Sequence, residues 1–251
     1  MPKNKSEESF SDLIDELNRM PVIHNCQNCK VETEDLVMDD ITGLLLCAKC
    51  AEIFKQKAIA QDIRSHIFKM NIPKKFVNSS LLNYDPESDK EKAELLALVK
   101  MYCTQTTNLL GRCLTLFGKT GTGKTHLGVG VLKKFAGVKI YGMYVEAWKI
   151  ADEIKRTWGK DSKQHEGQII EKYAQMPLLF IDEIGKFPED KIAQKNVWKV
   201  ISSRYNNNVP TVLCSNDNEE SLTSYLSVEI VDRLKHNNGI FIELTHESYR
   251  R

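Results

Sequence analysis

The chain has 251 residues, a formal net charge of +1, and ordinary shares of hydrophobic (41%) and charged (27%) residues. This composition excludes a largely disordered chain, and the sequence has no apolar run of about eighteen residues that would span a membrane. A net charge near zero provides no global field for nucleic acid, so any DNA contact needs a local group of basic residues. The polar, charged N-terminus lacks a signal-peptide pattern, and we expect a cytoplasmic protein.

The first predicted element is a short amphipathic helix. Its apolar residues recur at helical spacing and are followed by a proline: Phe10, Leu13, Ile14, Leu17, Met20 and Pro21. This apolar face suits a groove on a partner protein, and it equally suits packing against the module that follows. The sequence leaves both interpretations open.

Two CxxC pairs come next, Cys26 with Cys29 and Cys47 with Cys50, separated by seventeen residues. In a reducing compartment, clustered cysteines are typical of metal ligation, and this spacing is that of a four-cysteine zinc ribbon or knuckle. Zinc would replace the hydrophobic core that so short a segment lacks. A redox-active CxxC is the alternative, which two copies at ribbon spacing disfavour.

A basic, helix-favouring stretch runs from about residue 48 to 70, and a boundary is expected just after it. Residues 1–70 are therefore predicted as an N-terminal unit with a helix, a zinc-ribbon-like module and a linker helix. In residues 71–251, a helix over 87–104 is followed by short apolar runs that alternate with helical stretches. These runs are Cys113–Phe117, Ile140–Val145, Leu178–Ile181, Thr211–Cys214 and Ile240–Leu244. The pattern predicts an α/β domain with a parallel sheet and helices on both faces.

The first of these runs leads into a P-loop. The residues Gly118, Lys119, Thr120, Gly121, Thr122, Gly123, Lys124 and Thr125 match GxxxxGK[ST], and the helix-like stretch after them begins at His126. Glycines let backbone N–H groups face phosphates, and the helix adds the positive end of its dipole. We expect Lys124 to contact the β- and γ-phosphates of ATP and Thr125 to ligate Mg²⁺.

Acidic and polar residues follow two later runs. Asp182 and Glu183 end a buried-looking strand, as in a Walker B motif, where the first acid would hold Mg²⁺ and the second would orient the attacking water. Asn216 follows the next strand, where a polar side chain is able to reach the γ-phosphate or that water. The sequence therefore predicts an ATPase.

These residues resemble the AAA+ family of replicative helicase loaders typified by DnaC and DnaI, with the transposition helper IstB as a close relative. The resemblance covers about 180 residues from Ile72 onward and includes residues 72–76, the P-loop, 181–185, 203–207, 215–216, 232–234 and 247–251. It implies an AAA+ P-loop NTPase core that acts in an ATP-dependent oligomer. It also implies that Arg204 is an arginine finger supplied to a neighbouring subunit and that Arg233 is a sensor-2 arginine contacting its own nucleotide.

The same resemblance implies two macromolecular partners. Loaders of this family grip a hexameric replicative helicase with their N-terminal part, which in DnaI binds zinc, so residues 1–70 are expected to dock on a helicase. A helix after the second strand lines a pore for single-stranded DNA. Here residues 145–163 offer Lys149, Lys155 and Arg156 as the expected DNA contacts, with Lys160, Lys163, Trp148 and Trp158 nearby.

Other functions remain open to the sequence. A transposition helper shares the ATPase core but acts on duplex DNA, whereas the zinc module and the closing Ser-Tyr-Arg favour a loader. A small-molecule P-loop kinase would use the same Lys124 and Asp182, yet Glu183 suits attack by water. A DNA-binding protein with a decayed ATPase is disfavoured by the intact motifs.

Overall fold

The structure, a computed structural model, describes residues 24–39, 44–87, 89–105, 111–186 and 189–249. The chain forms two compact units, Met1–Asp62 and Ile63–Arg251. The division lies within one long helix, α2 (Ala48–Lys69), whereas the predicted boundary at residue 70 falls at the end of that helix. The predicted helix around Phe10–Met20 lies outside the described residues.

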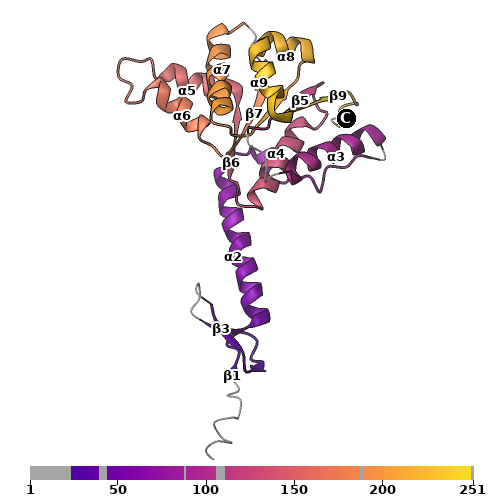
Figure 1. Cartoon of the computed structure of the whole chain (residues 1–251), viewed down its shortest axis with the longest axis vertical. Coiled ribbons are helices and arrows are strands. Elements are labelled where there is room, and N and C mark those ends of the chain that lie inside the picture. Colours follow the sequence, from indigo (N-terminus) through magenta and orange to yellow (C-terminus); the bar gives the residue numbers. More distant parts are fainter. Residues whose placement is uncertain (1–23, 40–43, 88, 106–110, 187–188, 250–251) are drawn as a thin grey trace, which may run out of the picture. The chain divides into compact units, whose positions relative to one another are not determined.

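The first unit contains two small antiparallel sheets and the start of α2 (Figure 1). Strand β1 (His24–Asn25) pairs with β2 (Glu32–Thr33), and β3 (Leu36–Met38) pairs with β4 (Leu45–Cys47). Its buried residues are only Cys26, Leu46 and Cys50 among those described, with partly buried neighbours such as Leu36 and Phe54. A core this small does not hold a fold by itself, so the unit needs a further source of stability.

The second unit is built on a five-stranded parallel sheet in the order β6-β7-β8-β5-β9. The strands are β5 (Leu114–Gly118), β6 (Gly142–Glu146), β7 (Leu178–Ile184), β8 (Thr211–Ser215) and β9 (Ile240–Leu244). Each overlaps one of the predicted apolar runs. Strand β5 lies between β8 and β9, while the chain continues from β5 to β6 at the far edge. Ligands bind at the carboxyl ends of strands where the order reverses in this way.

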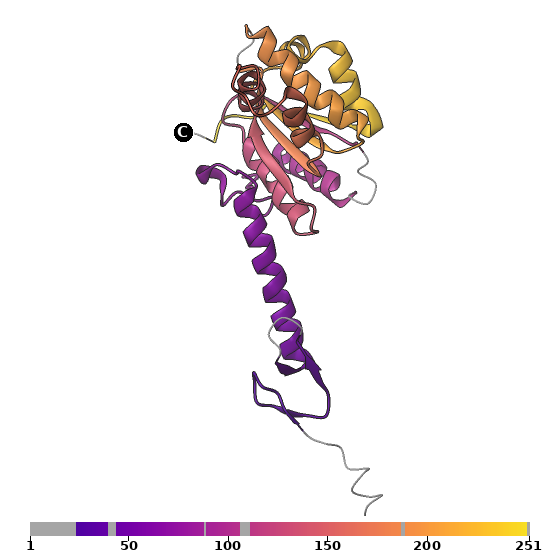
Figure 2. The same cartoon turned by 90° about the vertical axis from the view of Figure 1, so that its left-hand side faces the viewer.

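Helices cover both faces of this sheet (Figures 1 and 2). On one face lie α3 (Lys90–Thr104), α4 (Lys124–Ala136) and the end of α2. On the other lie α5 (Ala147–Arg156), α6 (Glu166–Ala174), α7 (Lys191–Asn206), α8 (Glu219–Leu226) and α9 (Val228–Lys235). Short 3₁₀ turns, η1 (Lys74–Phe76) and η3 (His236–Asn238), precede α3 and β9. The predicted α/β architecture is therefore confirmed.

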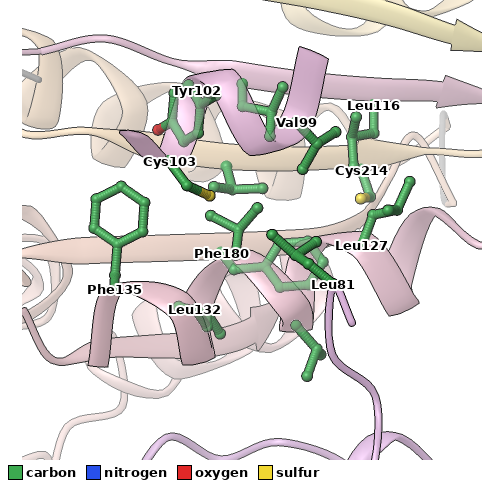
Figure 3. Close-up of a cluster of buried hydrophobic side chains, with 14 of the residues drawn as sticks. Leu81, Val99, Tyr102, Cys103, Leu116, Leu127, Leu132, Phe135, Phe180 and Cys214 are labelled. Carbon is green, nitrogen blue, oxygen red and sulfur yellow. The ribbon is translucent and has the colours of Figure 1, made fainter. Parts of the chain in front are cut away.

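Strand residues divide between two hydrophobic clusters because successive side chains point to opposite faces. In β7, Leu178 and Phe180 join the cluster under α3 and α4, whereas Leu179 and Ile181 join the cluster under α5–α9. Figure 3 shows the first cluster, where side chains of α3 and α4 meet residues of the sheet, among them Phe180, Leu116 and Cys214. A Cβ at Gly128 would lie 2.3 Å from the Phe180 ring, so only glycine lets α4 approach the sheet this closely.

Two helix boundaries differ from prediction for local reasons. Helix α3 begins at Lys90 because the Asp89 side chain accepts the N–H groups of Glu91 and Lys92 and caps it. The helix expected over 145–163 ends at Arg156 and is followed by a loop and by α6. Within the described residues, no helix is long and apolar enough to cross a membrane.

Candidate functional site

The P-loop joins β5 to α4, and its shape requires glycine at several positions. Gly121 and Gly123 have φ of +88° and +90°, in the left-handed region where other residues are strained. A Cβ at Gly121 would also lie 1.9 Å from the Ser248 side chain. The loop leads directly into Lys124, the first residue of α4, so that the amino end of the helix faces the loop. This is the backbone arrangement that holds phosphates.

Two P-loop side chains reach their expected surroundings. Lys124 is buried, and its Nζ donates to the carbonyl oxygens of Gly118 and Lys119 at 2.7 Å each. Thr125 Oγ1 donates to Asp182 Oδ2 at 2.9 Å. The tertiary fold therefore places the end of the P-loop beside the first acid of β7, although the two are far apart in the sequence.

The two acids of β7 lie at an irregular part of the strand. Pairing between β7 and β8 shifts between Ile181 and Ile184, and Glu183 has a φ of +57°. Such irregularities re-aim side chains and are common beside active sites. Glu183 forms an ion pair with Lys186 at 2.6 Å. Burial raises the pKa of the Asp182 carboxyl, against the effect of hydrogen bonds from Glu183 N–H, Thr125 and Tyr144.

A cavity of about 520 Å³ lies over these groups, within the usual size range of small-molecule sites. The predicted residues that line it are Thr120, Gly121, Gly123, Lys124, Thr125, His126, Asp182, Glu183 and Asn216. The other predicted P-loop residues, Gly118, Lys119 and Thr122, belong to the loop rather than to the described lining. The Thr122 hydroxyl donates to the carbonyl of Lys119 at 2.9 Å and braces the turn.

An aromatic group that sequence reasoning missed lies at one side of the P-loop. Tyr249 donates its N–H to Gly121 O at 3.0 Å and its hydroxyl to Asp85 O at 2.9 Å. Its ring meets Tyr84 edge-on at 5.8 Å, and Lys92 Nζ lies 4.3 Å from the Tyr249 ring centroid. Both tyrosines line the cavity. Tyr249 belongs to the closing motif noted in the sequence, but no pattern there indicated Tyr84.

A second missed residue lies in the middle of the site. Tyr144, on β6, donates its hydroxyl to Asp182 Oδ2 at 3.1 Å and lines the cavity. Its neighbour along the strand face, Glu146, is the register partner of Asp182. The sequence indicated β6 only as a buried strand, so nothing in it distinguished these two residues.

The four cysteines of the first unit meet as predicted. Their Sγ atoms all lie within 4.8 Å of one another, and those of Cys29 and Cys47 are 3.8 Å apart. A tetrahedral Zn²⁺ with Zn–S bonds of about 2.3 Å places its sulfurs about 3.8 Å apart, so the cluster has the right size. Backbone N–H groups, of Cys29 first and then Cys47, lower the pKa of Cys26 to about 6, while hydrogen bonds with the other thiols raise the pKa of Cys29 to about 11. The site is therefore compatible with zinc.

Comparison with known proteins agrees with this geometry. Residues 17–251 match the family described as IstB-like ATP binding protein. The chain belongs to this family. Replicative helicase loader DnaC of Escherichia coli K12 is 23% identical over 242 residues, which cover 96% of each chain. The crystal structure of the DnaC helicase loader matches with a TM-score of 0.60 at 21% identity, over 70% of this chain and 100% of that one. The crystal structure of DnaI gives 0.57 at 20% identity, over 72% and 95%.

These matches confirm the predicted membership of the IstB-like ATP binding proteins and the AAA+ fold. At such low sequence identity, the similarity to these solved structures shows the fold alone. Family membership confirms a nucleotide-binding protein of the ATPase type, and the lining of the cavity is consistent with it.

The prediction that Arg204 is an arginine finger is wrong. This side chain is fully buried, and its guanidinium donates to the carbonyls of Tyr173 and Met176 and to Thr211 Oγ1 at 2.6 to 2.9 Å. An arginine finger must reach a nucleotide on another subunit, which a buried guanidinium is unable to do. In this IstB-like protein Arg204 instead ties α7 to the end of α6 and the start of β8.

The sensor-2 role predicted for Arg233 is not supported either. Arg233 lies on α9, half-exposed, with its guanidinium carbon 5.6 Å from the ring centroid of Tyr205. It is not among the described residues that line the cavity over its own P-loop. Contact with its own nucleotide therefore has no basis in this structure.

Each of the predicted DNA-binding cations forms an ion pair with an acid at the surface. Lys149 pairs with Glu146 at 2.6 Å, Lys155 with Asp190 at 2.5 Å, and Arg156 with Asp152 at 2.6 Å. The loop that follows α5 differs, because Lys160 and Lys163 are exposed there and no ion pair within the described residues involves them. Trp158 in the same loop is 51% exposed.

Proposed function

We propose that this protein is an ATP-dependent loader of a replicative DNA helicase. The observation that carries the proposal is similarity to DnaC over 96% of both chains, combined with a P-loop and Walker B acids that meet in one cavity. A loader works beside the chromosome, so a cytoplasmic location is part of the proposal.

In this proposal ATP and Mg²⁺ bind in the cavity over the P-loop. The oxygen donors of Thr125 and Asp182 suit Mg²⁺, which would neutralise charge on the phosphates. Lys124 would exchange the loop carbonyls for the β- and γ-phosphates. Glu183, on leaving Lys186, would orient the attacking water, and Asn216 would contact that water or the γ-phosphate.

We assign helicase docking to the first unit. Among its described residues, three apolar side chains are more than half exposed: Val31 at 51%, Val37 at 51% and Met38 at 62%. We propose these side chains as contacts for the helicase. The predicted apolar face of Phe10, Leu13, Ile14 and Leu17, which lies outside the described residues, is proposed as a further helicase contact.

Single-stranded DNA is proposed to contact the loop after α5 rather than α5 itself. Exposed Trp158 offers a stacking surface, and Lys160 and Lys163 offer charge, whereas Lys155 is already paired with Asp190. We expect Trp158→Ala to weaken binding of a single-stranded oligonucleotide about 10-fold, because stacking contributes roughly 1–3 kcal/mol per base. Fluorescence anisotropy at fixed salt measures this. Equal losses in Trp158→Ala and the matched control Trp198→Phe, which lies in α7, would contradict it.

Self-association with ATP is also part of the proposal. Arg204 is buried, so Arg233 is the arginine from the predicted pair that remains available to a neighbouring subunit. Sedimentation with and without ATP tests assembly, and a monomer under both conditions would count against it.

The decisive experiment is delivery of the host's replicative helicase. We expect purified protein to pull down the helicase and to place it on a single-stranded circle when ATP is present, whereas Lys124→Ala binds helicase without responding to ATP. Helicase retained on the circle is the readout. Absence of a complex, together with ATP-dependent binding to duplex DNA, would establish the transposition-helper alternative. A phosphorylated metabolite would establish the kinase alternative, which family membership disfavours.

A further inference from the structure

We propose that Tyr144 is a positioning residue that orients Asp182 for the magnesium of the nucleotide. The inference rests on the proposed binding of Mg²⁺ and ATP at this site. It concerns a residue on β6 that belongs to neither the P-loop nor the acidic pair of β7.

The hydrogen bonds of the Asp182 carboxylate define its orientation. Oδ2 accepts from Thr125 Oγ1 at 2.9 Å and from the Tyr144 hydroxyl at 3.1 Å, while Oδ1 accepts from Glu183 N–H at 2.8 Å. A carboxylate has about four lone-pair sites, so these three bonds leave about one, on Oδ1. That site is the one available to the hydration shell of a metal ion. Tyr144 thus determines which oxygen of Asp182 serves the metal.

Tyr144 is itself held firmly. Its side chain is 4% exposed, its ring meets Phe180 edge-on at 5.3 Å, and its backbone N–H donates to Met70 O at 2.8 Å. Strands β6 and β7 pair in register with Tyr144 opposite Phe180 and Glu146 opposite Asp182, which puts Tyr144 and Asp182 on one face of the sheet. A rigid donor fixes an acceptor better than a mobile one does.

A buried hydroxyl that only satisfied its own hydrogen bond would behave differently. Its removal would lower stability with or without metal. A change in the orientation of Asp182 instead reduces the gain in nucleotide affinity that Mg²⁺ produces. The quantity that separates the two roles is the ratio of two dissociation constants for a non-hydrolysable ATP analogue, one with EDTA and one with saturating Mg²⁺.

The test uses the full chain with Tyr144→Phe, which keeps the ring and removes the hydroxyl. We expect the ratio to fall about 10-fold, the usual loss when a group behind a metal ligand is removed, with affinity in EDTA within about twofold of wild type. Tyr102→Phe is the matched control, because Tyr102 is also buried and its hydroxyl donates to the carbonyl of Arg112. Calorimetry or a fluorescent analogue supplies both constants.

The Asp182→Asn background provides the second arm. If Tyr144 acts through Asp182, adding Tyr144→Phe to Asp182→Asn changes the ratio no further. An unchanged ratio in Tyr144→Phe, or equal losses with EDTA and with Mg²⁺, would overturn the inference while leaving the ATPase intact. Wild-type protein that binds no nucleotide under either condition would instead overturn the proposed function, and this inference with it.

Discussion

Lys124→Ala is expected to abolish nucleotide binding at micromolar concentrations. The Lys124 ammonium lies buried among the P-loop carbonyls, in the loop proposed to hold the phosphates of ATP. Hydrogen bonds between charged groups contribute roughly 1.5–3 kcal/mol each, so losing contacts to two phosphates lowers affinity for MgATP by about 100-fold or more. Titration of a fluorescent ATP analogue measures the loss, and hydrolysis is expected to disappear with it.

Lys119→Ala is the matched control for that change. Lys119 lies in the same loop, but its side chain is exposed and only its carbonyl contacts Lys124. Affinity within about twofold of wild type is expected, because an exposed surface substitution changes little. If Lys124→Ala bound MgATP as well as Lys119→Ala does, this cavity would not be the nucleotide site.

The double change Cys26→Ser with Cys47→Ser is expected to remove zinc and unfold the first unit. Among described residues, the buried core of this unit is little more than Leu46 and the cysteines themselves. Zinc binding contributes about 10–16 kcal/mol to folding in zinc-finger peptides, so little holds the unit together without it. The zinc content, measured by elemental analysis, is expected to fall from about one zinc per chain to none. Hydrogen exchange is expected to show lost protection over residues 24–39.

The second unit provides the control. The hydrophobic clusters of the second unit contain neither cysteine pair. The double variant is therefore expected to bind ATP within about twofold of wild type while its binding to the helicase is lost. A Cys103→Ala variant, changed on the buried side of α3, is expected to contain as much zinc as wild type. Wild-type protein that holds no zinc and forms reversible disulfides between these cysteines would support the redox alternative instead.

Much of the fold and the site could be predicted because the signals are local. Each strand of the parallel sheet is a short apolar run, and a run of that kind needs no distant partner to be recognised. The P-loop glycines and the cysteine pairs are also local, because the turn around phosphate and the grip on a metal ion depend on residues a few positions apart. The buried strand that ends in two acids is a local pattern as well, and as a Walker B motif it predicts that Asp182 lies beside Lys124 and Thr125; the lining of the cavity is consistent with that prediction.

The wrong predictions concern side chains whose environment is set by distant residues. The neighbours of Arg204 in the sequence resemble an arginine-finger motif, yet the carbonyls that bury it come from the end of α6 and the loop before β8. The ion pair of Lys155 is also set by a distant residue, because Asp190 comes from another segment, and the DNA contact predicted for Lys155 stays a prediction. A charge counted along the chain does not reveal the partner that folding will bring to it.

The class of the domain, the phosphate loop, the acids of β7 and the four-cysteine cluster can all be predicted from the sequence, since each depends on spacing within one segment. The folded chain is needed to see that Tyr144 donates to Asp182, that Tyr84 and Tyr249 line the same cavity, and that Arg204 is buried. These arrangements join segments separated by tens of residues or more, and strand order and helix packing select them. Periodicity within one segment carries no information about which distant segment will pack against it.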